Sequence, residues 1–427
     1  MGTMTEIRTM QPKSIGSTPF CVGGLKGGLL ALVGLGLIAC CLVAVPARAC
    51  EGPAESPALQ RCELLEEGIR ENLKGHYGEA DLIWQTLREQ DPTDPAPDVW
   101  EAETAWWRLI LNDGAVEQDQ RIQSAAERAI DLADARLRVH SQDAAAMRDK
   151  GLALMMLTRL DGMRGRYLSA GRSGEKARAL LEESMALDAT QSDGRFPLAV
   201  YYYYAGIAPS FVKWVSWLWF IPKGDRDQGL SLMQQVRDEP GVRSDEARFM
   251  LMVVNTYHAP MDLPAALEAG RVLHARYPDN VLFHSELVEI LLKQELYEEA
   301  IETALALEAQ SPEDEVARSR PMLARILRAQ ATLLNGSPNE AAAILATMDE
   351  DKALLPVWGR AWFYLVEAQV LDAQGDRQAA VSQYRRVQEL VGAAYNERAA
   401  RIAEMGMEVP FSSAVYEERP MVGAGRP

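Results

Sequence analysis

One pattern recurs along this chain and limits its fold more than any other feature. A turn residue, often glycine, precedes a small residue, and a bulky apolar residue follows one helical turn later. The clearest copies start at Gly75, Glu295 and Gly375 and place Ala80, Ala300 and Ala380 at the small position. A small residue lets two helices approach closely, and the bulky residue fills the gap beside it. The pattern therefore predicts a series of helical hairpins, each packed on the next.

The same phase can be followed through most of the chain. The small positions are Ala80, Ala129, Ala177, Gly229, Ala266, Ala300, Ala341 and Ala380. The first three intervals are 49, 48 and 52 residues, and the later ones are 37, 34, 41 and 39. Insertions or longer helices both account for the extra length of the early repeats. The sequence predicts an all-α superhelical solenoid of about seven or eight helical hairpins over residues 61–400.

These motifs resemble those of known families. The repeats resemble the tetratricopeptide repeat (TPR) superfamily, which implies a superhelix whose first helices line an inner groove for a protein or peptide. The Gly-Asp-Arg turn of Gly224–Leu232, with Tyr257 and His258 downstream, is similar to that of the tetratricopeptide repeat 39 and inclusion-body clearance family. A looser likeness is to the periplasmic TPR lipoproteins that partner tripartite solute transporters.

The charge balance and the missing motifs narrow the classes of function. The chain has 44 basic and 61 acidic residues, a net charge of −17, which disfavours nucleic-acid binding. It has no Gly-rich phosphate loop, no H-E-x-x-H and no paired C-x-x-C, so we expect no enzyme and no cofactor. His258, His274 and His284 lie within 27 residues. Because they occupy different repeat positions whose faces need not converge, we expect no metal site.

Residues 1–49 have the pattern of a targeting segment. Basic residues precede an uncharged apolar run over residues 27–45, and Ala47-Arg48-Ala49 matches an A-x-A cleavage site. We expect signal peptidase to release a chain that begins at Cys50, in the periplasm or cell envelope. The alternative is a retained membrane anchor, because the apolar run is about long enough to span a bilayer.

Two cysteines remain in the expected mature chain. Cys50 and Cys62 would form one local disulfide in an oxidising compartment, and separate thiols are the alternative. A lipid anchor on Cys50 is a further alternative, which would make the chain a lipoprotein. We interpret residues 50–60 as a short linker.

The likeness to TPR proteins also implies which side chains face the groove. The superfamily's groove positions fall on a mixture of polar and aromatic residues, which suits a peptide or protein segment. The candidates for partner binding are Phe196, Tyr203, Arg248, Asn255, His258 and Trp362, with Val200, Ser285, Glu289, Gln330, Gln369 and Asp372 at equivalent positions. For any one of them, the alternative is a solvated groove residue without a partner.

An aromatic insertion at residues 207–223 stands apart from the repeats. Three Trp and two Phe fall within the ten residues from Phe211 to Phe220. The simplest interpretation is that the insertion packs over the solenoid. A hydrophobic platform or lid at residues 211–222 and an interfacial membrane contact are the alternatives. Trp214, Trp217 and Trp219 are the candidate ligand or membrane contacts.

The last residues, 401–427, show no helical periodicity, so we expect a disordered tail. The leading hypothesis is an exported TPR scaffold or adaptor that mediates protein–protein interactions in the bacterial cell envelope. Its partner would be a protein or peptide, with membrane-surface association as an additional contact. The alternative is a carrier of a small ligand or lipid with an aromatic lid. A continuous open groove would favour the scaffold, and a deep apolar pocket the carrier.

Overall fold

The computed structural model describes residues 56–112, 115–207, 225–241, 243–390 and 397–412. These residues form seventeen α-helices and two short 3-10 helices, at Ser192–Gly194 and Lys352–Leu354, and contain no β-strand. The prediction of an all-α fold is confirmed.

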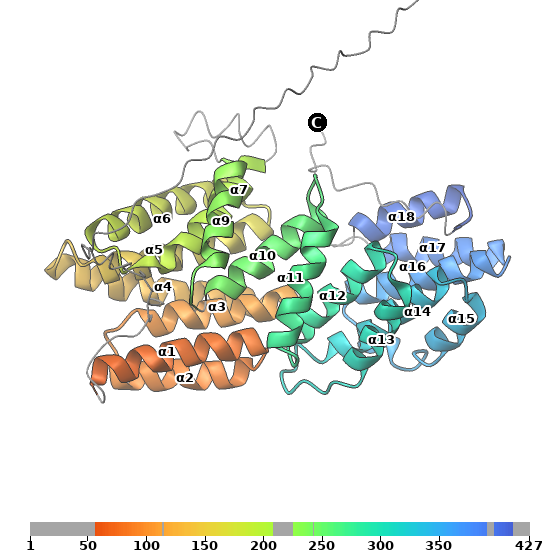
Figure 1. Cartoon of the computed structure of the whole chain (residues 1–427), viewed down its shortest axis with the longest axis horizontal. Coiled ribbons are helices and arrows are strands. Elements are labelled where there is room, and N and C mark those ends of the chain that lie inside the picture. The colour runs from red at the N-terminus through yellow and green to blue at the C-terminus, as the bar shows by residue number, and fades with distance from the viewer. Residues whose placement is uncertain (1–55, 113–114, 208–224, 242, 391–396, 413–427) are drawn as a thin grey trace, which may run out of the picture. The chain divides into compact units, whose positions relative to one another are not determined.

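Consecutive helices pair as hairpins (Figure 1). The first four are α1 (Pro57–Lys74) with α2 (Tyr77–Gln90), α3 (Ala96–Leu111) with α4 (Val116–Val139), α5 (Ala144–Met163) with α6 (Tyr167–Leu187), and α7 (Arg195–Ile207) with α9 (Arg226–Asp238). The next four are α10 (Arg243–Tyr257) with α11 (Leu263–Arg276), α12 (Val281–Lys293) with α13 (Tyr297–Glu308), α14 (Ser319–Leu334) with α15 (Pro338–Ala346), and α16 (Val357–Ala373) with α17 (Arg377–Leu390). A further helix, α18 (Glu397–Glu408), makes the array longer than the predicted seven or eight hairpins.

The small residue of each repeat lies where two helices touch. All eight predicted small positions, from Ala80 to Ala380, are buried. The turns behave as the pattern requires, because Gly75 and Gly375 both adopt a φ of 87°, a conformation that residues with a Cβ avoid. In the remaining copy, Glu295 at the equivalent turn also has a positive φ, of 60°. The small and turn positions predicted from the sequence therefore coincide with those of the observed hairpins.

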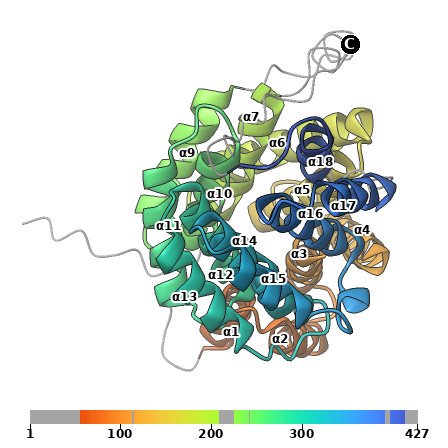
Figure 2. The ribbon, with the colours of Figure 1, turned by 90° about the vertical axis from the view of Figure 1, so that its right-hand side faces the viewer.

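The first helices of successive hairpins lie side by side. Figure 2 shows α14 between α12 and α16, and contacts also join α16 to α18. At the other end of the array, α3 contacts both α1 and α5. These contacts between first helices, with each second helix packed on its own first helix, make the described part of the chain a TPR-like array.

The early hairpins also pack against the middle of the chain. The Trp107 ring on α3 lies 5.4 Å from the Phe249 ring and 6.0 Å from the Phe283 ring, centre to centre. Asn280 Nδ2 donates a 2.8 Å hydrogen bond to the Leu73 carbonyl, and Arg243 Nη1 lies 2.9 Å from Glu103 Oε1. The inner faces of α3, α10 and α12 therefore fill one another as core and do not form an open groove.

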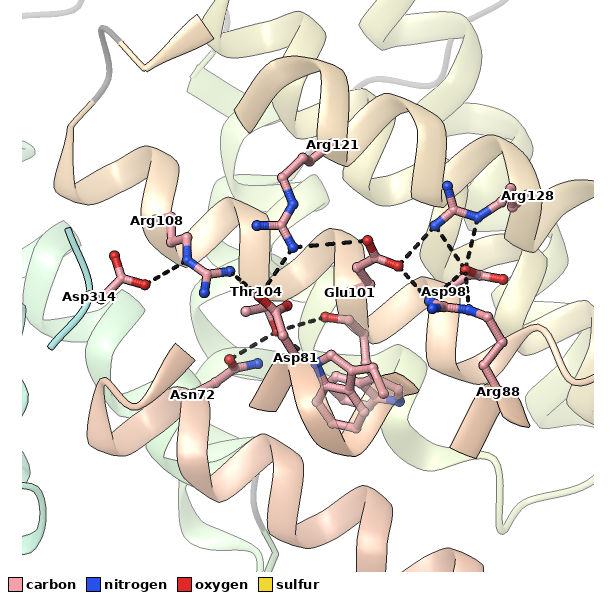
Figure 3. A network of polar contacts seen from close by, with 12 residues as sticks. Asn72, Asp81, Arg88, Asp98, Glu101, Thr104, Arg108, Arg121, Arg128 and Asp314 are labelled. Atoms are coloured by element: carbon pink, nitrogen blue, oxygen red, sulfur yellow. Dashed lines mark hydrogen bonds and ion pairs between the residues drawn. The ribbon is translucent and has the colours of Figure 1, made fainter. Parts of the chain in front are cut away.

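A polar network reinforces this closure (Figure 3). Arg108 on α3 pairs with Asp81 at 2.8 Å and, through Nε, with Asp314 at 2.7 Å, 206 residues later in the chain. Arg121 also reaches Asp81, at 3.1 Å. Arg108 is largely buried, so its charge depends on these two carboxylates for compensation.

The C-terminal boundary of the array differs from the prediction. Helix α18 continues to Glu408, beyond the expected end at residue 400, because Ala399 and Ala403 are buried against α16 and α17. Arg377 Nη2 donates to the Met407 carbonyl at 2.7 Å, and the Phe411 amide donates to Asp372 Oδ2 at 2.9 Å. The expected disordered tail from residue 401 is therefore wrong as far as residue 412, and residues 413–427 lie outside the described part.

Several predictions fall on residues that the structure does not describe. These are the targeting segment 1–49, most of the linker at 50–60, and all but the first residue of the insertion at 207–223, with Trp214, Trp217 and Trp219. Within the described residues, no helix has both the length and the apolar character needed to cross a membrane.

Candidate functional site

A pocket lies on the first-helix side of the array, between α12, α14, α16 and α18. It contains about 620 Å³ of empty space, which includes its open mouth. Its walls are formed by Ser285, Glu289, Leu292 and Lys293 on α12, Arg320, Leu323, Ile326, Leu327 and Gln330 on α14, Trp358 and Trp362 on α16, and Arg398 on α18. Half of these twelve side chains are apolar, and the other half are polar or charged.

The lining of the pocket is more basic than the protein as a whole. Three basic side chains, Lys293, Arg320 and Arg398, share the wall with one acidic side chain, Glu289. The whole chain carries a net charge of −17. The pocket therefore concentrates positive charge on an acidic molecule, which favours an anionic ligand.

Each arginine of the pocket lies over a tryptophan. The Arg320 guanidinium carbon is 5.2 Å from the centre of the Trp358 ring, and that of Arg398 is 5.0 Å from the centre of the Trp362 ring. Arg398 also pairs with Glu289 at 3.4 Å, which links α18 to α12. Cation–π contacts of this kind hold both guanidinium groups against apolar walls.

Two carboxylates of α12, one of them in the pocket lining, share one tyrosine. The Tyr257 hydroxyl lies 2.8 Å from Glu286 Oε2 and 2.9 Å from Glu289 Oε2. Burial and the neighbouring charge of Glu289 raise the pKa of Glu286 to about 7. Burial alone would also raise the pKa of Glu289, but Arg398 and Lys293 outweigh it and lower that pKa. Glu289 is therefore ionised near neutral pH, whereas Glu286 is only partly ionised there, and the three basic side chains of the lining outnumber its one carboxylate.

Lys293 also responds to its surroundings. Burial, followed by the charge of Arg398, lowers the pKa of Lys293 to about 8. Its ammonium lies 5.4 Å from the centre of the Tyr257 ring. The lysine is thus still mostly protonated at pH 7 but close to titration.

Four of the predicted groove residues meet in this pocket: Ser285, Glu289, Gln330 and Trp362. Their helices, α12, α14 and α16, are the first helices of consecutive hairpins. The groove positions implied by the TPR likeness therefore converge here only in part, because the side chains of Gln369 and Asp372 on α16 are buried and do not line the pocket.

The remaining candidates lie elsewhere. Phe196 and Tyr203 are buried in the core between α7, α9 and α10, so neither is accessible to a partner. Tyr203 also shares a 2.8 Å hydrogen bond with His258 Nδ1, and the two rings stack. Burial and then Arg226 lower the pKa of His258. These three residues support the packing of a hairpin.

Arg248 and Asn255 on α10 are partly exposed. Arg248 Nε lies 3.3 Å from Asp245 Oδ1, one turn earlier. The Asn255 carbonyl accepts a hydrogen bond from the Asp262 amide at 3.0 Å. Neither residue lines the pocket, so the structure does not bring them together with Trp362.

The three histidines were expected on helix faces that need not converge, and the structure brings two of them together. The His274 and His284 rings are 4.2 Å apart, centre to centre, so the faces of α11 and α12 that carry them do converge. His284 Nδ1 also lies 3.1 Å from Gln310 Nε2. Among the described residues, no group of three or more His, Cys, Asp or Glu side chains is placed to hold a metal ion.

The structure describes only one of the two cysteines of the predicted disulfide. Cys62 on α1 is disulfide-bonded. Cys50, its predicted partner, lies outside the described residues, so the pairing stays a prediction.

Sequence reasoning missed eight residues of the pocket lining, among them Lys293, Arg320, Trp358 and Arg398. Trp358 could have been found, because it lies one turn before Trp362 on the same helix and shares its face. Arg398 was missed because no repeat was predicted after the one that contains Ala380. Nothing in the local sequence marks Arg320 as a pocket residue.

No protein-family model and no curated protein matches this chain. Among solved structures, it is similar to one described as the crystal structure of the yeast Tom70, with 11% sequence identity. The match covers 81% of this chain and 87% of that one, with a TM-score of 0.35. Because so low a score does not establish a common fold, the TPR-like architecture stands on the hairpins of this chain alone.

Proposed function

We propose that this chain is an exported TPR-like scaffold or adaptor protein that binds a segment of another protein in the pocket between α12, α14, α16 and α18. The observation that carries the proposal is the pocket lining, in which two Trp–Arg pairs stand on the first-helix face. Tryptophan and arginine are the side chains that most often dominate binding energy at protein interfaces.

The cell-envelope part of the proposal rests on residues 1–49. If signal peptidase cleaves after Ala49, the native protein begins at Cys50. We expect mass spectrometry of protein isolated from its own organism to find that N-terminus, without added acyl mass. A mature chain that retains residues 29–45 would identify a membrane anchor, and a mass increased by acyl chains would identify a lipoprotein.

Site-specific photo-crosslinking tests the binding site. Leu327 lines the pocket, whereas Leu305 on α13 is exposed on the second-helix side. Each leucine is replaced in turn by benzoylphenylalanine, and cells of the source organism are irradiated. We expect a defined protein adduct from position 327 and none from position 305. Equal adducts at both positions, or none at position 327, would contradict a protein-binding pocket.

A carrier of a small ligand is the second candidate, because Leu323, Ile326 and Leu327 give the pocket an apolar wall, and because the inner faces of α3, α10 and α12 do not form an open groove. Native mass spectrometry of the protein purified from its organism distinguishes the two. A retained small molecule, together with no adduct at position 327, would favour the carrier.

A further inference from the structure

A C-terminal segment of the chain binds to a residue that the TPR likeness assigned to the groove. After α18, residues 409–412 continue without regular structure, and we call them the strap. The Phe411 amide of the strap donates a 2.9 Å hydrogen bond to Asp372 Oδ2, and the Asp372 side chain is completely buried. The Phe411 ring packs against two apolar clusters, one that contains Leu334 on α14 and one that contains Val370 on α16. The strap is therefore held by both its backbone and a side chain.

Asp372 is the centre of a small polar network that receives this segment. Both of its carboxylate oxygens lie 3.0 Å from Arg377 Nη1, and the Tyr384 hydroxyl donates to Oδ2 at 3.0 Å. Arg377 Nη2 donates in turn to the Met407 carbonyl at 2.7 Å, shortly before the strap. Hydrogen bonds in which one partner is charged are stronger than neutral ones. The carboxylate thus binds a backbone amide and the guanidinium a backbone carbonyl, which together recognise a main chain whatever its side chains.

The strap and the pocket share one face of α16. Trp358, Trp362 and Asp372 lie at positions i, i+4 and i+14, which fall on one stripe of an α-helix. The two tryptophans line the pocket, and Asp372 lies near the other end of the helix. The distance from Trp362 to Asp372 is about 15 Å along the helix axis, which about five residues of an extended chain span. A peptide that leaves the pocket along this stripe therefore meets the strap.

We propose that the strap is an autoinhibitory contact, an internal ligand that the bound partner must displace. The partner is an extended segment with a bulky apolar side chain in the place of Phe411, and its backbone amide replaces the Phe411 amide at Asp372. This inference rests on the proposed function, since it names the regulation of the same groove. Only molecules whose strap is released bind the whole segment, so the strap lowers the apparent affinity by the released fraction.

A peptide added to the full chain tests whether the strap can be exchanged. The probe is a fluorescein-labelled peptide with the sequence of residues 408–414, and a second probe has alanine in place of its phenylalanine. Fluorescence anisotropy measures the binding of both to the wild type and to Phe411→Ala. We expect the first peptide to bind Phe411→Ala at least about tenfold more tightly than the wild type, where the tethered strap competes at an effective concentration on the order of millimolar. The alanine peptide should bind neither protein.

Two further variants separate the strap from general packing. Val409→Ala changes a side chain of the same segment that is 57% exposed, so it should bind the peptide no better than the wild type. Phe411→Leu keeps the amide and an apolar side chain, and its affinity should lie within about threefold of the wild type. Circular dichroism and unchanged hydrogen exchange in α14 confirm that each variant folds. If Phe411→Ala does not fold, the order of wild type, Val409→Ala and Phe411→Leu still decides, with the leucine variant binding the peptide most tightly.

Crosslinking at position 327 connects the strap to the proposed function. We expect Phe411→Ala to increase the yield of the protein adduct at least about threefold, and Val409→Ala to leave it unchanged. An adduct of equal yield in the wild type and Phe411→Ala would overturn the inference and keep the proposed function. If no variant gives an adduct, the proposed function fails, and the peptide titration alone decides about the strap. Equal binding of the peptide to wild type and Phe411→Ala, or no binding to either, would also overturn the inference.

Discussion

Single small residues decide how closely neighbouring helices of this array pack. A Cβ on Gly229 would lie 2.5 Å from the Tyr203 amide nitrogen and 2.8 Å from the Ala199 carbonyl oxygen. Both are backbone atoms of α7, so neither can turn aside as a flexible side chain would. The glycine at this repeat position is therefore required by contact between the backbones of α7 and α9.

We expect Gly229→Ala to lower the free energy of unfolding by about 1–3 kcal/mol, because α9 must move away from α7. Gly78→Ala is the matched control. Gly78 is also helical, but a Cβ there would meet nothing within 4 Å. Urea denaturation measures both variants. Equal stability of the two would show that α7 and α9 can separate at no cost.

The buried histidine pair predicts a dependence on pH. Burial and the neighbouring His274 lower the pKa of His284 to about 4, below the value near 6.5 of an unfolded chain. Between these values the unfolded chain binds more protons, so stability falls as the pH falls. From pH 7 to pH 5, the wild type should lose about 1–2 kcal/mol more than His284→Gln. Urea midpoints at both pH values provide the measurement, and parallel losses would remove His284 from the acid response.

Among the helices, α12 is fixed at its start by a buried cap. Asn280 Oδ1 accepts hydrogen bonds from the amides of Leu282 and Phe283, at 2.9 and 3.1 Å. Its Nδ2 donates to the Leu73 carbonyl in the last turn of α1. One side chain thus completes the beginning of one helix and the end of another, 207 residues apart in the chain.

Asn280→Ala should therefore cost more than the loss of an ordinary cap. Removal of an N-cap costs about 0.5–2 kcal/mol, and the Leu73 carbonyl also loses a buried donor. Asp225→Ala is the control, since Asp225 caps α9 through the amides of Asp227 and Gln228 and is exposed. Thermal unfolding of the two variants compares them. A loss for Asn280→Ala no larger than that for Asp225→Ala would mean that the bond to α1 contributes nothing.

The hairpins could be predicted because their determinants are local. The positions of Ala80 and Ala300 follow from a spacing of a few residues, which can be recognised in a short stretch of sequence. The site could be predicted only in part. Phe196 and Tyr203 were assigned to an open groove, but α7 packs into a core that depends on α10. Arg320 meets Ile110 across 210 residues, and no sequence spacing encodes that contact.

Across the described array, contacts between distant repeats change how it should unfold. In a solenoid whose repeats touch only their neighbours, stability is a sum of local terms. Here Trp107, Glu103 and Arg108 on α3 contact residues on or beside α10, α12 and α14. Helix α3 should therefore unfold together with the middle of the chain.

Trp107→Ala tests this coupling. The substitution leaves a cavity beside Phe249 and Phe283, and such changes cost about 3–5 kcal/mol. We expect hydrogen exchange to accelerate in α10 and α12 as well as in α3, and to change little in α17. Mass spectrometry of deuterium uptake resolves these helices. Acceleration confined to α2–α4 would show that the early hairpins form a separate folding unit.

The contact between Trp107 and Phe249 also limits how many hairpins can lie between α3 and α10. A solenoid in which each hairpin contacts only the adjacent hairpins can gain or lose a hairpin at any position, because no distant contact is broken. Between α3 and α10, however, the chain must travel out through α4, α5, α6, α7 and α9 and return to the same tryptophan. One more hairpin between α3 and α10 would move α10 past α3 and separate Arg243 from Glu103. Relatives that keep these residues should differ in their loops or beyond α15, while helices α4, α5, α6, α7 and α9 are all kept.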